Sequence, residues 1–267
     1  MPIFAGMTSR ERSQVFGELA EEYHRVRPGY PAGLAGDLLS SAGPGPVLEV
    51  GAGTGKASAL FAAHGIDLTC LEPDPRMAAV LRRAVPGVAV IESTFEDWTP
   101  DRGYGLIISA QAWHWVDTAR RHELAFAALA PGGLLAPFWN VFLLPDDELY
   151  SALAEVDARH GLTGNHTPHS MRPADIPAGP VPFAEQWPEL TGIEELFTDL
   201  RTLSYRSTRA YSSTGYRAHL SSISAYRILE DAERETVLDE TIEVLDAHGG
   251  TIDFAVHTYA ALARRPV

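Results

Sequence analysis

Short apolar runs alternate with helical patterns over the first half of the chain. Four apolar runs have the length of buried strands, and they cover residues 47–50, 67–72, 88–91 and 105–110. After the second run, Met77, Val80 and Leu81 recur at helical spacing behind Pro75, which suits the first turn of a helix. Strands that alternate with helices predict an α/β fold with a mostly parallel sheet.

The second half of the chain has a less regular pattern. The run 134–144 predicts a core strand and its exit loop, and Pro137 inside it predicts a bulge or an early strand end because proline cannot donate to the ladder. The runs 196–204 and 251–263 predict the last two strands. A helix is predicted over 146–160, and a later helical stretch is predicted to hold Tyr211, Tyr216, His219 and Tyr226.

A glycine-rich turn follows the first apolar run. Glu49 lies two residues before Gly51, and glycines then alternate through Gly53 and Gly55 to the predicted helix at Lys56. Glycine reaches positive φ and lets a ligand approach the backbone closely, so the turn predicts a nucleotide-binding site. A dinucleotide fingerprint requires its third glycine at position 56, where this chain has lysine. The dehydrogenase interpretation is therefore the weakest.

Four segments together resemble the class I methyltransferases that use S-adenosyl-L-methionine. They are the glycine turn, Leu71–Met77, Ser109–Asp117 and Leu129–Gly133, and the likeness covers about residues 15–140 well and the remainder in outline. The third segment is similar to one in bacterial small-molecule methyltransferases, including trans-aconitate-type relatives. The resemblance implies a Rossmann-like, doubly wound, mostly parallel seven-stranded sheet with an antiparallel last strand and a helical lid.

The resemblance also implies roles for residues around the cofactor. Glu49 would order its ammonium group, the glycines would make room, and Glu72 would accept hydrogen bonds from both ribose hydroxyls. Phe95 would be a wall for the adenine ring. Thr94 stands where many relatives have Asp or Asn, so Glu96 or Asp97 would supply the adenine edge contact instead. The predicted cofactor-binding residues are Tyr23, Arg27, Glu49, Gly51, Ala52, Gly53, Thr54, Gly55, Glu72, Pro73, Met77, Thr94, Phe95, Glu96, Ala110 and Gln111.

Two tryptophans bracket His114 directly after the fourth predicted strand, where an open α/β sheet has its ligand crevice. Aromatic faces attract a sulfonium cation once water is excluded. His114 has the chemistry to remove a proton from a hydroxyl or amine near neutral pH, and it is the predicted catalytic residue; the alternative is a packed histidine that holds the loop. The predicted substrate-binding residues are Trp113, Trp115, Trp139, Tyr211, Tyr216 and His219.

The predicted domain organisation is one methyltransferase domain over residues 1–267. A lid over 10–31 contains a helix from Ser13 to Val26 that ends before Pro28, and its apolar side holds Val15, Phe16, Leu19, Tyr23 and Val26. Insertions at 141–195 and 208–250 are predicted to form a substrate cap. His160, His166 and His169 lie in and beside a loop rich in Gly and Pro without a carboxylate at a ligand interval, so no metal is expected.

Composition restricts the partners and the compartment. The chain has 267 residues and a formal net charge of -14, with no basic run beyond arginine pairs, which disfavours nucleic acid. Cys70 is the only cysteine, so neither an intrachain disulfide nor a cysteine-based zinc site is expected. The first residues lack a signal-peptide pattern and no apolar run approaches a membrane span, so a cytoplasmic protein without membrane contact is expected, its oligomeric state open.

The predicted function is transfer of the methyl group of S-adenosyl-L-methionine to a small molecule, as O-methylation of a hydroxyl or carboxylate. Two alternatives are another reaction in the same pocket and a non-catalytic protein that binds this cofactor. An open aromatic pocket beside Trp113 would favour the enzyme. A pocket filled by Phe142 or Tyr216 would favour the binding protein.

Overall fold

The chain divides into two compact units. The computed structural model describes residues 20–162, 167–177 and 181–267. The sheet unit comprises Pro28–Asn140, Gly179–Tyr205 and Thr258–Val267, and the helical unit comprises Met1–Arg27, Val141–Ala178 and Arg206–His257. The helical unit takes in most of the predicted insertions 141–195 and 208–250, whose role as a substrate cap stays a prediction.

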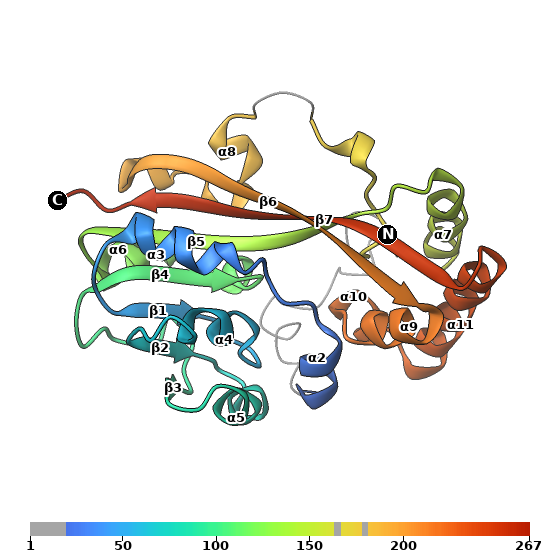
Figure 1. Cartoon of the computed structure of the whole chain (residues 1–267), viewed down its shortest axis with the longest axis horizontal. Helices are drawn as coiled ribbons and strands as arrows, with labels where there is room; N and C mark the ends of the chain where they lie inside the picture. The colour runs from blue at the N-terminus through green and yellow to red at the C-terminus, as the bar shows by residue number, and fades with distance from the viewer. Residues whose placement is uncertain (1–19, 163–166, 178–180) are drawn as a thin grey trace. The chain divides into compact units, whose positions relative to one another are not determined.

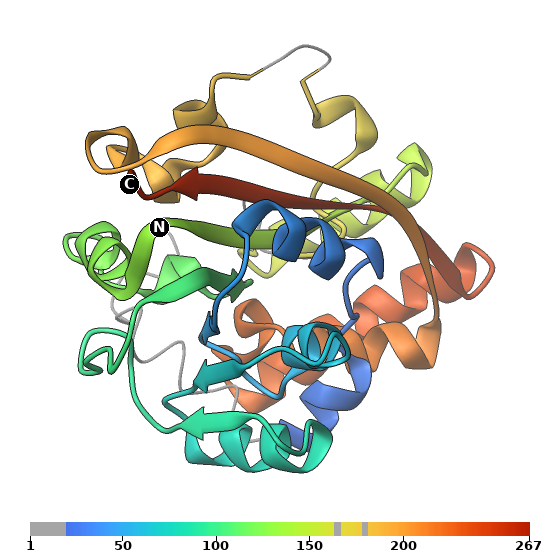
Figure 2. The ribbon, with the colours of Figure 1, turned by 60° about the vertical axis from the view of Figure 1, so that its left-hand side comes forward.

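One seven-stranded sheet contains the predicted strands in the order β3-β2-β1-β4-β5-β7-β6 (Figure 1). Its strands are β1 (Val47–Val50), β2 (Leu68–Leu71), β3 (Ala89–Ile91), β4 (Tyr104–Ala110), β5 (Leu129–Leu143), β6 (Thr198–Ser212) and β7 (Thr251–Arg264). The first five pair in parallel, and β7 runs against its neighbours (Figure 2). This arrangement confirms the predicted Rossmann-like, mostly parallel sheet.

The sheet unit has apolar side chains on both faces of its central strands. Leu48 and Ile107 point into one buried cluster, whereas Val47, Leu106 and Ile108 point into the other. Both faces are buried because the parallel strands are connected by helices that cover them. The helical segments of this unit are α3 (Gly33–Ala42), α4 (Lys56–Ala62), α5 (Pro75–Ala84), η2 (Trp113–Trp115), α6 (Arg121–Ala128), α8 (Phe183–Gln186), η4 (Pro188–Leu190) and η5 (Ile193–Glu195).

The expectation of a bulge or strand end at Pro137 is wrong. β5 continues through Pro137, which pairs in register with Ser109, and the register shift lies at Tyr104 and Leu106 instead. Phe138 accepts a hydrogen bond from the Gln111 N–H, so its peptide groups face β4. The peptide groups of successive residues in a strand point to opposite neighbouring strands. The N–H group that Pro137 lacks would therefore point away from β4, toward the strand on the other side of β5.

β6 is longer than predicted. It continues past Ser204 to Ser212, so Tyr211 lies on a strand and its placement in a helical stretch is wrong. Most side chains of β6 are exposed because it is the edge strand of the sheet. An exposed edge strand lacks the apolar alternation that marks a half-buried one, and the sequence pattern therefore ended too early.

The helical unit has its own apolar core. Its helical segments are α2 (Ala20–Val26), α7 (Asp147–Arg159), η3 (Pro173–Asp175), α9 (Ser213–Ser221), α10 (Ser224–Arg227) and α11 (Asp231–Ala247). Leu153 of α7, Leu220 of α9 and Leu238 of α11 are buried in one cluster. The Asp146 carboxylate caps α7 by accepting from the N–H groups of Glu148 and Leu149. Of the predicted N-terminal helix, Val15, Phe16 and Leu19 lie outside the described residues.

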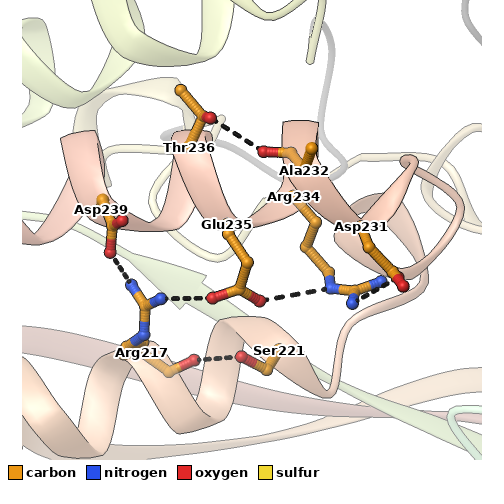
Figure 3. Close-up of polar contacts among 8 residues, drawn as sticks. All are labelled: Arg217, Ser221, Asp231, Ala232, Arg234, Glu235, Thr236 and Asp239. Carbon is orange, nitrogen blue, oxygen red and sulfur yellow. Dashed lines mark hydrogen bonds and ion pairs between the residues drawn. The ribbon is translucent and has the colours of Figure 1, made fainter.

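An ion network joins α9 to α11 (Figure 3). The Arg217 guanidinium donates to Asp239 Oδ1 and to Glu235 Oε2, each at 2.7 Å, and Arg234 contacts Asp231 at 2.7 Å. An isolated exposed ion pair contributes little to stability. Here one arginine of α9 contacts two carboxylates of α11 and so fixes the spacing between the two helices. Among the described residues, no helix combines the length and the apolar character needed to cross a membrane.

Candidate functional site

The carboxyl ends of β1 and β4 meet where the strand order reverses. β2 lies on one side of β1 and β4 on the other, which is the topological switch point where open α/β sheets bind ligands. Gly51 follows β1 with a φ of +69°, and a Cβ there would lie 2.5 Å from the Ala112 Cβ after β4. Only glycine therefore permits the two loops to approach this closely.

The other two glycines of the turn have different surroundings. Gly55 has a φ of +88°, and an added Cβ would lie 2.4 Å from Leu81 Cδ1 of α5. Gly53 has a φ of +57°, and its Cβ would meet no atom within 4 Å. Packing thus explains Gly51 and Gly55, whereas Gly53 presents bare backbone to open space. The neighbouring Thr54 side chain is buried, and its Oγ1 has no hydrogen-bond partner.

The Glu72 carboxylate is tied to the glycine turn. Its Oε2 accepts from the Gly53 N–H at 2.7 Å and its Oε1 from the Asp74 N–H at 2.9 Å. Burial raises the pKa of Glu72 to about 7, although these two hydrogen bonds act in the opposite direction. Asp74 also caps α5 through the N–H groups of Arg76 and Met77. The strand-end acid predicted from the sequence therefore lies directly beside the turn.

Glu49 is a second buried acid at the same place. The Ser58 hydroxyl donates to its Oε2 at 2.6 Å, while Oε1 is buried without a hydrogen-bond partner. Burial raises the pKa of Glu49 to about 8, and the nearby charge of Glu72 adds to the effect. Two buried carboxyl groups with raised pKa values form a pair that a cation would stabilise in the ionised state. Ser58, on the inner face of α4, was not predicted from the sequence.

The loop after β3 uses most of its polar side chains internally. The Thr94 hydroxyl donates to Asp97 Oδ2 at 2.8 Å, and Glu96 Oε1 accepts from the Asp117 N–H at 2.6 Å. Phe95 is buried and packs 6.2 Å, between ring centroids, from Trp113. Thr94 and Glu96 therefore hold the loop in shape, and their contact with an adenine edge stays a prediction.

Gln111, directly after β4, has a strained backbone. Its φ is +58°, a value that costs a residue with a side chain about 1–2 kcal/mol. Its Nε2 donates to the Asn140 carbonyl at 3.1 Å, and the Asn140 side chain accepts from Thr258 and donates to the Gly29 carbonyl. Such strain is typical of functional sites, and Asn140, which was not predicted as a site residue, connects four segments here.

Comparisons with known proteins agree with this geometry. Residues 47–133 match the model of a family described as a methyltransferase domain. An uncharacterized methyltransferase of Mycobacterium tuberculosis is 39% identical over 132 residues, which make up 49% of this chain and 54% of that protein. The chain thus spans about half the length of the curated relatives it matches first.

Two solved structures share the fold. One, from Anaeromyxobacter dehalogenans and provisionally named a type II methyltransferase, has a TM-score of 0.59 at 21% identity, covering 90% of this chain and 97% of its own. The other, a SAM-dependent methyltransferase from Thiobacillus denitrificans in complex with S-adenosyl-L-homocysteine, has a TM-score of 0.51 at 16% identity, covering 92% and 96%.

Residues 47–133 thus form a methyltransferase domain. Within this domain, the structure brings together the predicted residues on the glycine turn, at Glu72 and at the end of β4. Pro73 is exposed beside Glu72, Met77 is buried on α5, and Ala52 is buried in the turn. Ala110 is the last residue of β4, next to Gln111.

The tryptophan segment of the methyltransferase domain is only partly available to a ligand. Trp113 is fully buried in the core, and its predicted contact with substrate stays a prediction. Trp139 is also buried and stacks on Trp187 with ring centroids 4.9 Å apart. His114 is exposed, with its ring 4.5 Å from that of Trp115, and the alternative of a histidine that holds the loop stays open. The role of His114 as a base stays a prediction.

The remaining predicted residues lie in the helical unit. Tyr23 is under the Arg27 guanidinium, whose carbon is 4.9 Å from the ring centroid, and Arg27 Nη2 donates to the Ser222 carbonyl at 2.9 Å. Their predicted contact with the cofactor carboxylate stays a prediction. Three further residues, all predicted to bind substrate, are buried against one another: Tyr211, Tyr216 and His219.

The histidines considered for a metal have other roles or fall outside the described residues. His169 lies 2.9 Å from Asp157 Oδ2 through Nε2 and 2.6 Å from the Tyr216 hydroxyl through Nδ1. Asp157 is thus a carboxylate partner that the sequence spacing did not reveal. His166 is not described. Within 20–162, 167–177 and 181–267, no group of three or more His, Cys, Asp or Glu residues is placed to hold a metal.

Proposed function

We propose that this chain transfers the methyl group of S-adenosyl-L-methionine to a small-molecule acceptor. The observation that carries the proposal is the pair of buried acids, Glu49 and Glu72, beside the open backbone of Gly53 at the switch point. The methyltransferase-domain match covers the same turn, and the Thiobacillus denitrificans relative holds S-adenosyl-L-homocysteine.

The residues present fit this cofactor. The unpartnered Glu49 Oε1 suits an ammonium group, reached directly or through water, because a positive charge beside this buried acid would favour its ionised form. Glu72 uses each oxygen for one backbone N–H, and its remaining lone pairs suit the two ribose hydroxyls. The open space at Gly53 accommodates the body of the ligand.

When bound, the cofactor supplies a sulfonium whose methyl group is already reactive. The chain then contributes orientation of the acceptor behind that carbon and exclusion of water. We propose O-methylation of a hydroxyl or a carboxylate. A carboxylate needs no base, whereas for a hydroxyl the exposed His114 accepts the proton.

Two other functions are tested by the same measurements. A non-catalytic binding protein would bind S-adenosyl-L-homocysteine without turnover of any acceptor. A dehydrogenase would bind NAD, but α4 begins with Lys56 where the dinucleotide turn requires glycine.

Calorimetric titration separates these possibilities. S-adenosyl-L-homocysteine is expected to bind and NAD is not, and Glu72→Gln is expected to weaken binding by about tenfold or more, equivalent to about 1.4 kcal/mol. The control is Glu123→Gln, the same change at an exposed position of α6. Binding of NAD alone, or equal affinity in Glu72→Gln and Glu123→Gln, would reject the proposed site. A screen of acids, phenols and amines with labelled cofactor then identifies the acceptor class.

A further inference from the structure

His219 is a buried polar side chain whose hydrogen-bonding capacity is unused. It is 1% exposed, and neither ring nitrogen has a hydrogen-bond partner among the described residues. Burial and the positive charges of Arg27 and Arg209 lower the pKa of His219 to about 3. The ring is therefore neutral near pH 7 and offers one N–H donor and one acceptor nitrogen. Buried polar groups in folded proteins nearly always have a hydrogen-bond partner, so an unpartnered buried histidine calls for an explanation.

Aromatic rings of the same unit surround His219. Tyr211 stacks on it with ring centroids 5.0 Å apart and an interplanar angle of 17°. Phe142 lies at 5.7 Å and Tyr216 at 6.3 Å, measured between ring centroids. The packed rings leave His219 almost fully buried, and burial strengthens an electrostatic interaction made by its ring. They also leave the ring nitrogens of His219 without a protein partner.

The positive charges of two arginines, Arg27 and Arg209, contribute to the lowered pKa of His219. Arg209, exposed on β6, has its guanidinium carbon 5.2 Å from the centroid of the Tyr211 ring. Arg27 is half-buried; its Nη2 is held by the Ser222 carbonyl, and its Nε is buried without a partner. Neither arginine forms an ion pair with a carboxylate of the described residues. The chain has a net charge of -14, so carboxylates that could pair with these arginines are plentiful. Two arginines that lie near a neutral histidine and have no acidic partner therefore indicate a binding site for an anion.

We propose that His219, Arg27 and Arg209 form an oxyanion-binding site within the helical unit. The ligand class is a small molecule with a carboxylate or a phosphate. The neutral His219 donates its N–H to the oxyanion, and the arginines supply the compensating charge. The exposed Arg209 is the first cation that the ligand meets, and Arg27 lies deeper. All three side chains belong to one unit, so this assignment does not depend on the proposed methyl transfer.

The test follows the His219 ring directly in the full chain. Histidine labelled with ¹³C at Cε1 gives one signal per ring, and His219→Gln identifies the signal of interest. The protein is first saturated with S-adenosyl-L-homocysteine, whose own carboxylate is the competing occupant. Benzoate, citrate and inorganic phosphate are then added in turn, with benzamide as the neutral counterpart of benzoate. At least one oxyanion is expected to shift the His219 signal, and benzamide is not.

Arginine variants connect the shift to the oxyanion-binding site. Arg209→Gln is expected to weaken the effective oxyanion by about tenfold, equivalent to about 1.4 kcal/mol. Arg206→Gln is the control, since Arg206 is an exposed arginine on the same strand that acts on His257. Comparison of benzoate and citrate with phosphate decides between a carboxylate and a phosphate.

Three results would overturn the proposal. The first is that none of the three oxyanions shifts the His219 signal. The second is that Arg209→Gln and Arg206→Gln bind the oxyanion equally well. The third is that S-adenosyl-L-homocysteine alone shifts the His219 signal and that the added oxyanions then cause no further shift. The same titration is repeated without the cofactor product. If S-adenosyl-L-homocysteine does not bind at all, the proposed function fails, whereas the oxyanion result is still read from this second titration.

Discussion

Replacing Gly53 by alanine should separate cofactor binding from stability. Gly53 has a φ of +57° and no atom within 4 Å of an added Cβ. The left-handed conformation costs alanine about 1–2 kcal/mol, and reduced freedom of the unfolded chain returns about 0.5 kcal/mol, so the net loss of stability is about 1 kcal/mol. The new methyl group projects into the space that we assign to the cofactor, so the Kd for S-adenosyl-L-homocysteine should rise by at least about tenfold.

Gly65 provides the matched control for this substitution. It has a φ of +67° and likewise no atom within 4 Å of an added Cβ, but it lies in the connection between α4 and β2. Gly65→Ala should lose the same stability in urea denaturation and keep the wild-type Kd in calorimetry. If Gly53→Ala also keeps a Kd within twofold of the wild type, the glycine turn is not the cofactor cradle.

Three further changes test the neighbouring residues. Gly55→Ala should destabilise the fold by about 2–5 kcal/mol in urea, because its Cβ would overlap Leu81; a loss under 1 kcal/mol would contradict this packing. Glu49, with a pKa of about 8, should release a proton at pH 7 when an ammonium group binds beside it. Calorimetry in buffers of different ionisation enthalpy measures this proton release. The release should be absent in Glu49→Gln. His114→Gln should lower turnover of a hydroxyl acceptor without changing cofactor affinity, and unchanged turnover would end its assignment as a base.

The raised pKa of Glu49 also has a consequence for the ligand-free protein. An acid whose pKa is higher in the folded state than in the unfolded state binds more protons when folded. The stability that it contributes is therefore present near pH 4.5 and is lost as the pH rises toward 8. Glu49→Gln, which resembles the protonated acid, should remove this part of the pH dependence. Urea denaturation at pH 5 and pH 8, compared between the two proteins, measures it.

The sequence pattern predicted the site residues that directly follow a strand. The turn Gly51–Gly55 and the acid Glu72 follow short apolar strands, and parallel pairing of β1 and β2 brings their carboxyl ends together. Asn140 and Ser58 were missed because their roles arise from contacts with segments distant in sequence. The asparagine that interrupts the apolar run 134–144 was the available signal.

Features that depend on contacts with distant segments were not visible in the sequence. Trp113 follows β4 at the ligand end of the sheet, but its ring turns into the core against Phe95, a choice made by packing that spacing alone does not reveal. Tyr211 was assigned to a helix because an exposed edge strand carries little apolar alternation. The isolation of His219 from any hydrogen-bond partner becomes visible only once the surrounding rings are placed.

A crystal structure of the chain with S-adenosyl-L-homocysteine would show directly whether the glycine turn holds the cofactor. We expect the ribose hydroxyls on the Glu72 carboxylate, the amino group beside Glu49 Oε1, directly or through one water, and the ligand body over Gly53. Ligand density away from the carboxyl ends of β1 and β4, or Glu49 and Glu72 without polar contact to the ligand, would contradict it.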